Sequence, residues 1–310
     1  MNKSLWFLWL VPLFLGGCIF KNAEDKLEEK EIKEDILSGN LVVSVDESLL
    51  DFVEEQKEMF ELSYYNAKVQ LLGNPERSAI QDLLNGASYT AVLTRELSEE
   101  ENSYFEKRHI KPRVFKVATD AIILLTSASV QDTTITLGAI KSLLNGTDAG
   151  GYKEIAFPSL ESSIFRELLE KSDLDKAVNR YVTTYGSSKE VLTHLLNSSE
   201  PVLGAIGYSE YLRYKKTFDE INKIRILSVL NNEGEFADGK YHQPTQSNLA
   251  LGVYPLSRSV YVLNYQPNIG LGIGWSAFLT GDRGQRIVLK KGILPAKMPG
   301  REIIIREAIN

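Results

Sequence analysis

Apolar runs and amphipathic segments alternate along most of the chain. Short runs rich in Val, Ile and Leu have the pattern of buried strands, and they lie at 41–45, 67–72, 91–93, 114–125, 154–157, 202–208, 224–230 and 259–264. Segments with helical spacing of apolar residues separate many of them, at 49–64, 74–86, from 98 onward, and at 137–144, 163–171, 189–197, 275–279 and 282–290. This alternation predicts an α/β fold with a mainly parallel sheet that helices cover on both faces.

Several helix boundaries carry recognisable end signals. Pro75 follows an asparagine at the start of one helix, which then closes at Gly86. Ser98 and Glu101 have the spacing of a capping box. The polar, glycine-containing segment 231–239 is predicted to be a surface loop, and the glycines at 270, 272 and 274 are predicted to form a tight turn.

The first residues have the organisation of a lipoprotein signal peptide. Lys3 precedes an apolar run at 5–15, which is shorter than the roughly 18–20 residues that span a bilayer. Small residues then lead to Cys18, the only cysteine of the chain, so no disulfide or CxxC metal site is possible. We predict export to the cell envelope and a lipid anchor on Cys18; a buried core cysteine is the alternative.

A highly charged segment follows the signal peptide. The stretch 21–35 consists almost entirely of Lys, Glu and Asp with scattered Leu and Ile, and it cannot bury much surface. We interpret residues 19–40 as a solvated tether that holds the body away from the membrane. A helix that docks on a partner protein is the alternative interpretation.

Composition and charge narrow the possible partners. The formal net charge is −6, which argues against nucleic acid because phosphate backbones require a basic face. His109, His194 and His242 are isolated and lack the spacing of metal ligands. No metal and no cofactor are therefore expected.

The sequence contains no established catalytic motif. A G-x-S-x-G elbow, a G-x-x-x-x-G-K-[ST] loop and an H-E-x-x-H helix are all absent. We therefore predict that the protein is not an enzyme, although a hydrolase that uses Ser and His stays open at this point.

Three strand-to-helix junctions have the chemistry of an anion site. In an α/β sheet, ligands bind beyond the carboxyl ends of strands, where helix N-termini present free N–H groups. Ser48 lies in the first junction, Thr94 and Arg95 lie in the second, and Ser162 and Ser163 lie in the third. Hydroxyls and a guanidinium are suitable donors to an oxyanion. The alternatives are N-caps for the three serines and a surface ion pair for Arg95.

Asp120 interrupts a long apolar strand. A buried carboxylate is costly unless it is hydrogen-bonded. Asp120 is thus expected either to accept hydrogen bonds within the fold or to accept the proton of a monoprotonated ligand, and the structural role is favoured.

The order of several segments resembles a known family. These segments are SVDES at 44–48, AVLTREL at 91–97, KVATDAIILLT at 116–126, AIKSLLNG at 139–146, AIGY at 205–208, YPLSRSVYVLN at 254–264 and GDRGQRIVLKKGILPA at 281–296. Together they resemble the substrate-binding lipoproteins of phosphate-type ABC transporters, a branch of the type II periplasmic binding proteins. The resemblance extends from residue 41 to about residue 306.

The resemblance implies a type II fold with two lobes, mixed sheets covered by helices, and a cleft between the lobes. The first lobe is expected to comprise 41–126 and 248–310, and the second 127–247. The crossing segments are expected near 125–130 and 243–249. By similarity, the anion contacts fall on Ser48, Thr94, Arg95, Ser162 and Ser163.

The third junction departs from the family pattern. Phosphate-binding members commonly carry an arginine shortly before a Ser-Gly-Thr trio, whereas residues 157–164 here read FPSLESSI. Glu161 and, at the first junction, Glu47 add negative charge, and a like charge about 4 Å away costs on the order of 1–4 kcal/mol. Phosphate capture for an ABC permease is the leading hypothesis. A binding fold adapted to sensing or envelope assembly is the alternative.

Overall fold

The computed structural model describes residues 35–148, 150–178 and 180–300. The predicted signal peptide with Cys18 and most of the predicted tether lie outside these residues. Within the described part, no helix combines the length and the apolar character needed to cross a membrane.

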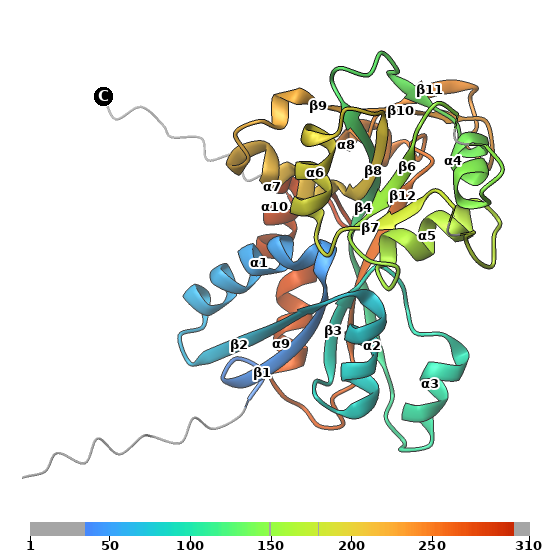
Figure 1. The fold of residues 1–310 in the computed structure, drawn as a ribbon. Helices are drawn as coiled ribbons and strands as arrows, with labels where there is room; N and C mark the ends of the chain where they lie inside the picture. Colours follow the sequence, from blue (N-terminus) through green and yellow to red (C-terminus); the bar gives the residue numbers. More distant parts are fainter. Residues whose placement is uncertain (1–34, 149, 179, 301–310) are drawn as a thin grey trace, which may run out of the picture. The chain divides into compact units, whose positions relative to one another are not determined.

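Ten strands form one mixed sheet (Figure 1). Eight of them follow the order β2-β1-β3-β12-β4-β8-β6-β7, while β13 and β9 also pair with β4. Their bounds are β1 Gly39–Asp46, β2 Ala67–Asn74, β3 Thr90–Leu93, β4 Arg113–Ser127, β6 Glu154–Phe157, β7 Val182–Thr184, β8 Val202–Gly207, β9 Ile224–Ile226, β12 Ser257–Asn264 and β13 Leu294–Pro295. A separate three-stranded sheet consists of β5 Thr134–Ile135, β10 Ser228–Asn231 and β11 Lys240–His242.

The pairing is parallel at both ends of the main sheet and antiparallel in the middle. Strands β1, β2 and β3 are parallel to one another, as are β6, β7 and β8. The central strands β12, β4 and β8 pair antiparallel. The prediction of a mainly parallel sheet is therefore correct only for the outer strands, because periodicity within a strand carries no information about the direction of its neighbour.

The long strand β4 joins the two halves of the sheet. Its residues 113–121 pair with β12, and its residues 122–125 pair with β8. We call the strands on the β12 side the first half and those on the β8 side the second half. The change of partner falls a few residues before the expected crossing at 125–130, and the lobe boundaries stay a prediction.

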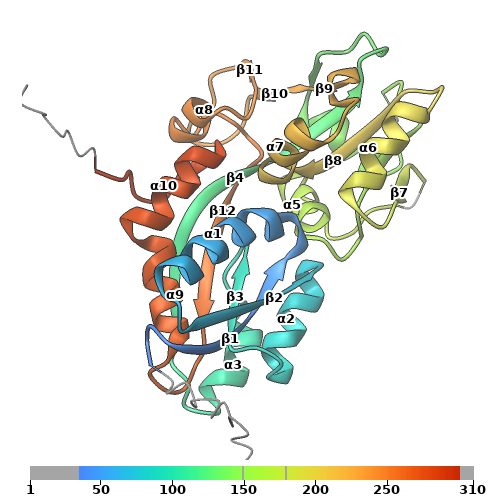
Figure 2. The same ribbon diagram turned by 90° about the vertical axis from the view of Figure 1, so that its left-hand side faces the viewer.

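Helices lie on both faces of each half. Their bounds are α1 Leu50–Ser63, α2 Glu76–Asn85, α3 Glu99–Glu106, α4 Leu137–Leu144, α5 Ser163–Lys171, α6 Ser188–Asn197, α7 Tyr208–Thr217, α8 Gln246–Ala250, α9 Leu271–Thr280 and α10 Asp282–Lys291, with short 3-10 turns η1 Glu47–Leu49 and η2 Ile221–Lys223. In the first half, α1, α9 and α10 contribute to one hydrophobic core, and α2 and α3 to another. Figure 2 shows α9 and α2 on opposite sides of this half.

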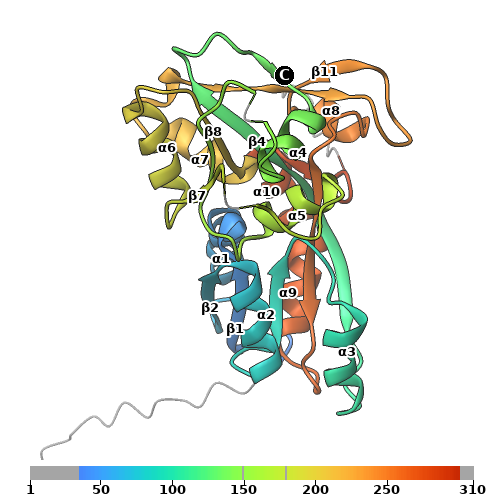
Figure 3. The same ribbon diagram turned by 45° about the vertical axis from the view of Figure 1, so that its right-hand side comes forward.

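The second half has the same layered construction. Helices α4 and α5 pack into one core, while α6 and α7 pack into the core on the other face. Figure 3 shows these two pairs on opposite sides of β8. The apolar run of β4 is buried throughout residues 120–126, as expected for a strand covered on both faces.

Several predicted end signals are confirmed. Ser98 and Glu101 form a capping box at α3, and α2 ends at Gly86 in the left-handed conformation with φ +77°. Helix α7, which directly follows β8, was not predicted, since the sequence interpretation extended the preceding strand to residue 208.

The glycine-rich segment after β12 is not the predicted tight turn. Gly270 precedes α9, and Gly272 and Gly274 lie inside its first turns. A β-carbon on Gly274 would collide with the backbone carbonyl of Ile36. The glycines therefore permit close backbone packing against α9.

The aromatic contacts of α1 allow a test of the hydrophobic core to which α1, α9 and α10 contribute. Phe60 is fully buried, and its ring lies 5.3 Å from those of Trp275 and Phe278. We expect Phe60→Ala to lower the free energy of unfolding by about 3–5 kcal/mol, because it removes these contacts and leaves a cavity. Tyr65→Ala, at a residue that is 83% exposed, should change it by less than about 0.5 kcal/mol. Urea denaturation of both variants measures the difference; equal effects would contradict the core assignment.

Candidate functional site

The first junction forms a small network of hydrogen bonds at the end of β1. Asp46 caps the 3-10 turn η1, and its Oδ1 accepts the Ser48 backbone N–H at 2.9 Å and the Ser48 hydroxyl at 2.7 Å. Both side chains are buried. The second carboxylate oxygen of Asp46 is buried and has no hydrogen-bond partner among the described residues. The Ser48 hydroxyl oxygen is therefore held in place with a lone pair available to a further donor.

Asp120 meets the start of α7. Its Oδ1 accepts the Ser209 backbone N–H at 2.9 Å, and its Oδ2 accepts the Ser209 hydroxyl at 3.1 Å. A carboxylate at a helix N-terminus is stabilised by the free N–H groups and the helix dipole. The favoured structural role of Asp120 therefore has a clear physical basis in this structure.

The third junction begins α5 with two serines that have different surroundings. The Ser162 hydroxyl accepts the Phe165 backbone N–H at 3.3 Å and donates to the Ser159 carbonyl at 2.7 Å, so Ser162 is an N-cap. Ser163 is fully buried, and its hydroxyl accepts a hydrogen bond from Arg258 at 3.1 Å.

Arg258 connects all three of these groups. It lies on β12 directly opposite Asp120 on β4. Its Nη2 donates to Asp120 Oδ2 at 2.8 Å and to the Ser48 hydroxyl at 3.0 Å, while its Nη1 donates to the Ser163 hydroxyl. Since Ser48 belongs to the first half and Ser163 to the second, one guanidinium links the two halves.

The Arg258–Asp120 pair is almost completely shielded from water. The two side chains are 1% and 0% exposed, respectively. Burial opposes the charged form of the guanidinium, but the carboxylates of Asp120, Glu167 and Asp46 outweigh burial and raise the pKa of Arg258 above its usual range. Room for the guanidinium depends on Gly207, where a β-carbon would lie 2.7 Å from Nη2.

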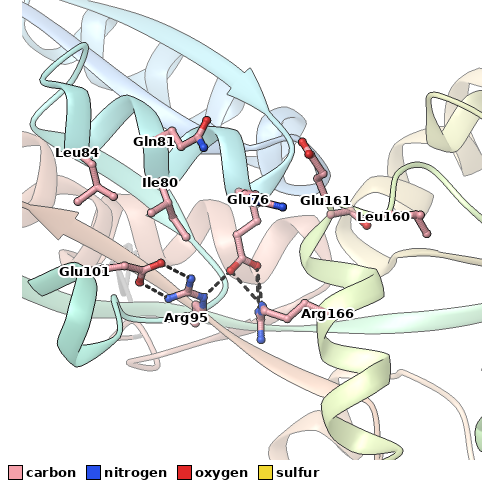
Figure 4. Close-up of a pocket in the computed structure, with 11 residues that line it drawn as sticks. Glu76, Ile80, Gln81, Leu84, Arg95, Glu101, Leu160, Glu161 and Arg166 are labelled. Carbon is pink, nitrogen blue, oxygen red and sulfur yellow. Dashed lines mark hydrogen bonds and ion pairs between the residues drawn. The ribbon is translucent and has the colours of Figure 1, made fainter. Parts of the chain in front are cut away.

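A second charged network lies beside the first and also crosses between the halves (Figure 4). Glu76, at the start of α2, is buried; its Oε1 accepts from Arg95 Nε at 2.7 Å and its Oε2 accepts from Arg166 Nη2 at 3.0 Å. Both terminal nitrogens of Arg95 also donate hydrogen bonds to the Glu101 carboxylate. The Thr94 hydroxyl accepts a hydrogen bond from Arg166 Nη2 at 3.1 Å. Glu101 has the largest effect on the pKa of Arg95 and raises it, although burial opposes this shift.

Two cavities open next to these networks. A cavity of about 380 Å³ lies between α2 and the β6–α5 turn; Ile80, Leu84 and Leu160 form its apolar wall, and Glu76, Arg95 and Arg166 form its polar wall. A second cavity of about 280 Å³ is lined by residues that include Thr94, Arg166, Glu167 and Arg258. This second cavity is the opening nearest to the buried guanidinium.

Glu47 faces a different part of the molecule. It lines a separate cavity of about 270 Å³ together with Asp51, Glu210 and Arg213. Burial, reinforced by Asp46, raises the pKa of Glu47 to about 7. The carboxylate therefore carries less negative charge near neutral pH than the sequence alone suggests.

The structure brings together only some of the residues that the sequence predicted for the anion site. Ser48, Ser163 and Asp120 meet at Arg258. Thr94 and Arg95 belong to the neighbouring network around Glu76, and the donors of Arg95 contact carboxylates and the Glu96 carbonyl. Ser162 caps α5. Their roles as ligand contacts stay a prediction.

Sequence reasoning missed Arg258, which is the centre of the cluster. The signal was weak: Arg258 lies between two serines just before the strand predicted at 259–264, whereas Asp120 interrupts an apolar run. Neither residue reveals its partner, because the two lie 138 positions apart in sequence. Arg166 and Glu167 lie in the helix predicted at 163–171, for which the sequence suggested no role at the site.

The histidines have local partners. His194 stacks on Tyr185 and contacts Glu154 at 2.7 Å, and His242 contacts Asp238 at 2.9 Å. Among the residues that the structure describes, no group of three or more His, Cys, Asp or Glu side chains could hold a metal ion.

Comparison with known proteins now gives the family. The sequence matches the PBP superfamily domain over residues 33–283, most of the chain. The chain belongs to the PBP superfamily. This family consists of binding proteins, in agreement with the prediction that the chain is not an enzyme.

Phosphate-binding proteins are among the relatives of this PBP superfamily member. The phosphate-binding protein PstS of Staphylococcus epidermidis is 21% identical over 243 residues, which cover 73% of this chain and 69% of the relative. PstS of Staphylococcus saprophyticus is 21% identical over 286 residues, covering 86% and 80%. The predicted resemblance to phosphate-type substrate-binding proteins is confirmed at this distance.

Solved structures support the type II fold. A putative phosphate ABC transporter substrate-binding protein from Clostridium perfringens with bound phosphate has a TM-score of 0.65 and 16% identity, over 84% of this chain and 100% of that chain. An ABC-type phosphate transport receptor from Vibrio cholerae has a TM-score of 0.61 and 17% identity, over 83% and 100%. The predicted fold class is confirmed.

A double-mutant cycle tests the buried ion pair. We expect Asp120→Asn and Arg258→Met each to lower the free energy of unfolding by about 3–5 kcal/mol, because each leaves an uncompensated buried group. The double variant should lose less than the sum, with a coupling of about 0.5–3 kcal/mol. Denaturant unfolding of the four proteins gives these values.

The exposed pair of Lys153 and Glu200 provides the control for this cycle. Both side chains are more than half exposed, so Lys153→Met should leave the unfolding midpoint unchanged. Strict additivity of the two buried substitutions would show that Asp120 and Arg258 act independently.

Proposed function

We propose that this chain is a membrane-anchored solute-binding protein that captures a small oxyanion, with phosphate as the first candidate, and delivers it to an ABC permease. The observation that carries the proposal is the meeting of two hydroxyls and one guanidinium from different parts of the fold. Ser48 and Ser163 stand at strand-to-helix junctions of opposite halves, and Arg258 contacts both.

The donor chemistry fits an oxyanion. A guanidinium offers a fixed set of N–H donors that matches tetrahedral oxyanions, and serine hydroxyls reorient to donate. Arg258 lines the 280 Å³ cavity, which reaches the surface, and the buried Ser163 hydroxyl lies within hydrogen-bond distance of the Arg258 guanidinium. These features support binding of a small oxyanion such as phosphate.

Arg258 also offers a replacement for the missing third-junction arginine. The family pattern places a cation just before the serine pair, where this sequence has none. Here a cation from β12 donates directly to the Ser163 hydroxyl. The positive charge therefore enters the site from a strand of the first half instead of from the loop.

The export signal and the similarity to transporter components support the location and the partner in this proposal. The predicted lipid on Cys18 would keep the protein at the membrane, where a permease could receive the ligand. The relatives from Staphylococcus are named as phosphate-binding proteins, and the relative from Vibrio cholerae is named as a transport receptor.

A binding fold adapted to sensing or envelope assembly is the second candidate. The observation that favours it is Asp120, an internal carboxylate that already occupies the guanidinium of Arg258. An incoming anion must share this cation with Asp120, which weakens binding. Measured affinity therefore separates the two candidates.

Calorimetry with phosphate provides the direct test. For the soluble chain without residues 1–18, we expect a heat of binding and a stabilisation of about 2.7 kcal/mol when phosphate is at a hundredfold excess over Kd. Sulfate provides the comparison for anion selectivity. A protein that shows neither heat nor thermal shift with phosphate would leave the sensing or assembly candidate.

Two neighbouring serines provide a matched pair of variants. Ser163→Ala should weaken phosphate binding by about tenfold, since it removes one hydrogen bond to a charged group. Ser162→Ala removes the cap of α5 and should lower stability by about 1 kcal/mol, with unchanged affinity. Isothermal titration and thermal unfolding of both variants separate the two effects. Loss of affinity in Ser162→Ala alone would show that the site has been placed on the wrong serine.

A further inference from the structure

Besides Asp46 and Asp120, a third buried acid, Glu167, lies close to the candidate anion site, on α5 in the second half. Glu167 lies one helical turn after Ser163 on α5, and its side chain is 9% exposed. It lines the 280 Å³ cavity together with Arg258 and Thr94. An anion bound at Arg258 in this cavity would therefore share the cavity with the Glu167 carboxyl group.

The groups that surround Glu167 come from four elements. Arg166, its neighbour on α5, donates to Glu167 Oε1 at 3.2 Å. Arg258 on β12 and Thr94 after β3 attract its charge, whereas Glu76 on α2 repels it. At the solvent edge of the same cavity are Arg95, Glu96, Glu170 and Lys171.

The balance of charge around the buried guanidinium is negative. Three carboxylates, those of Asp120, Glu167 and Asp46, act on Arg258. Asp120 accepts hydrogen bonds from Ser209 and Arg258, and Asp46 accepts two from Ser48; both carboxylates are fully buried. Glu167 accepts a hydrogen bond from Arg166, and Thr94 also forms one with it. Of the three acids, Glu167 alone is among the residues that line the 280 Å³ cavity, so a ligand and protons from solvent can reach it directly.

Glu167 is also placed to respond near neutral pH. Burial raises the pKa of Glu167 to about 7, although Arg258, Arg166 and a hydrogen bond with Thr94 oppose this rise. Addition of a negative ligand beside Arg258 would raise this pKa further, because the ligand repels the carboxylate.

We infer that Glu167 determines the protonation state of the complex: an oxyanion captured at Arg258 and Ser163 is bound together with one proton, which converts the Glu167 carboxylate to the neutral acid. The proton comes from solvent, or from the anion itself if it enters protonated. This inference rests on the proposed function. Once protonated, the Glu167 carboxyl no longer repels the anion and can donate a hydrogen bond to it.

The pH dependence has a defined direction. Below pH 7 Glu167 is already protonated in the free protein, so binding takes up no proton there. Above pH 7 the free carboxylate must be protonated on binding, and affinity falls by up to about tenfold per pH unit. The decline ends at the higher pKa that Glu167 has in the complex.

Phosphate titration of the soluble chain, wild type and Glu167→Gln, tests the inference. Isothermal titration between pH 6 and 8.5, in buffers of different ionisation enthalpy, counts the protons taken up. Phosphate's own titration is common to both proteins, so the difference isolates residue 167. At pH 8 we expect the wild type to take up about one more proton than Glu167→Gln and to bind about tenfold more weakly; at pH 6 the two should match.

Glu58→Gln provides the control, because Glu58 is an exposed glutamate on α1 that lines none of the three cavities described above. It should retain the proton count and the pH profile of the wild type. If Glu167→Gln does not fold, carbon-13 NMR of glutamate-labelled wild type gives the same information. Two glutamate carboxyls, those of Glu47 and Glu167, should then titrate near pH 7. The midpoint of Glu167 should rise when phosphate is present, whereas that of Glu47, which lines a different cavity, should stay the same.

The outcomes separate the two ideas. Phosphate binding with identical proton uptake in wild type and Glu167→Gln overturns the inference and leaves the proposed function intact. Absence of phosphate binding to the wild type at every pH, including pH 6, overturns both. If no glutamate carboxyl that titrates near pH 7 has a higher midpoint in the presence of phosphate, proton coupling is also rejected.

Discussion

The arrangement of this molecule depends on one buried ion pair. Arg258 and Asp120 face each other across the antiparallel β12–β4 pair, at the point where β4 changes from the first half of the sheet to the second. Separation of these charges in a dry environment would be very unfavourable. The pair therefore fixes the register of the two strands that connect the halves, and it draws a serine from each half toward a single guanidinium.

This constraint also shapes the chemistry of the site. A fully paired buried arginine is not a strong free anion receptor, since its charge is balanced before any ligand arrives. Affinity for an oxyanion then depends on how the surrounding acids share or lose their charge. In the proposed function, Glu167 is the group through which the site would adjust, because it lines the cavity whereas Asp120 does not. The proposal therefore implies weak or pH-dependent anion binding, since the same contacts also stabilise the fold.

The contacts between the halves are redundant. Besides Arg258, the carboxylate of Glu76 in α2 accepts hydrogen bonds from Arg166 in α5, and the Arg77 backbone N–H donates to the Glu161 carbonyl. Thr94 and Arg95, expected at the anion, take part in or beside this second network. Thr94, which was predicted to bind ligand, therefore links the two halves, because its hydroxyl accepts a hydrogen bond from Arg166 on α5.

The sequence by itself determined the α/β class, most strands and helices, the capping box at Ser98 and the family, because these follow from local periodicity and ordered short motifs. It also placed Ser48, Ser163 and Asp120 among the candidates, since hydroxyls at helix starts and a charge inside an apolar strand are visible locally. Only the tertiary structure decided that these three meet at Arg258, that Arg95 pairs with acids, and that α7 begins where Asp120 needs donors. The contacts of Arg258 and Asp120 join residues more than 80 positions apart, whereas Arg95 pairs with acids 19 and 6 positions away. No local pattern encodes which charges will share a buried, low-dielectric environment.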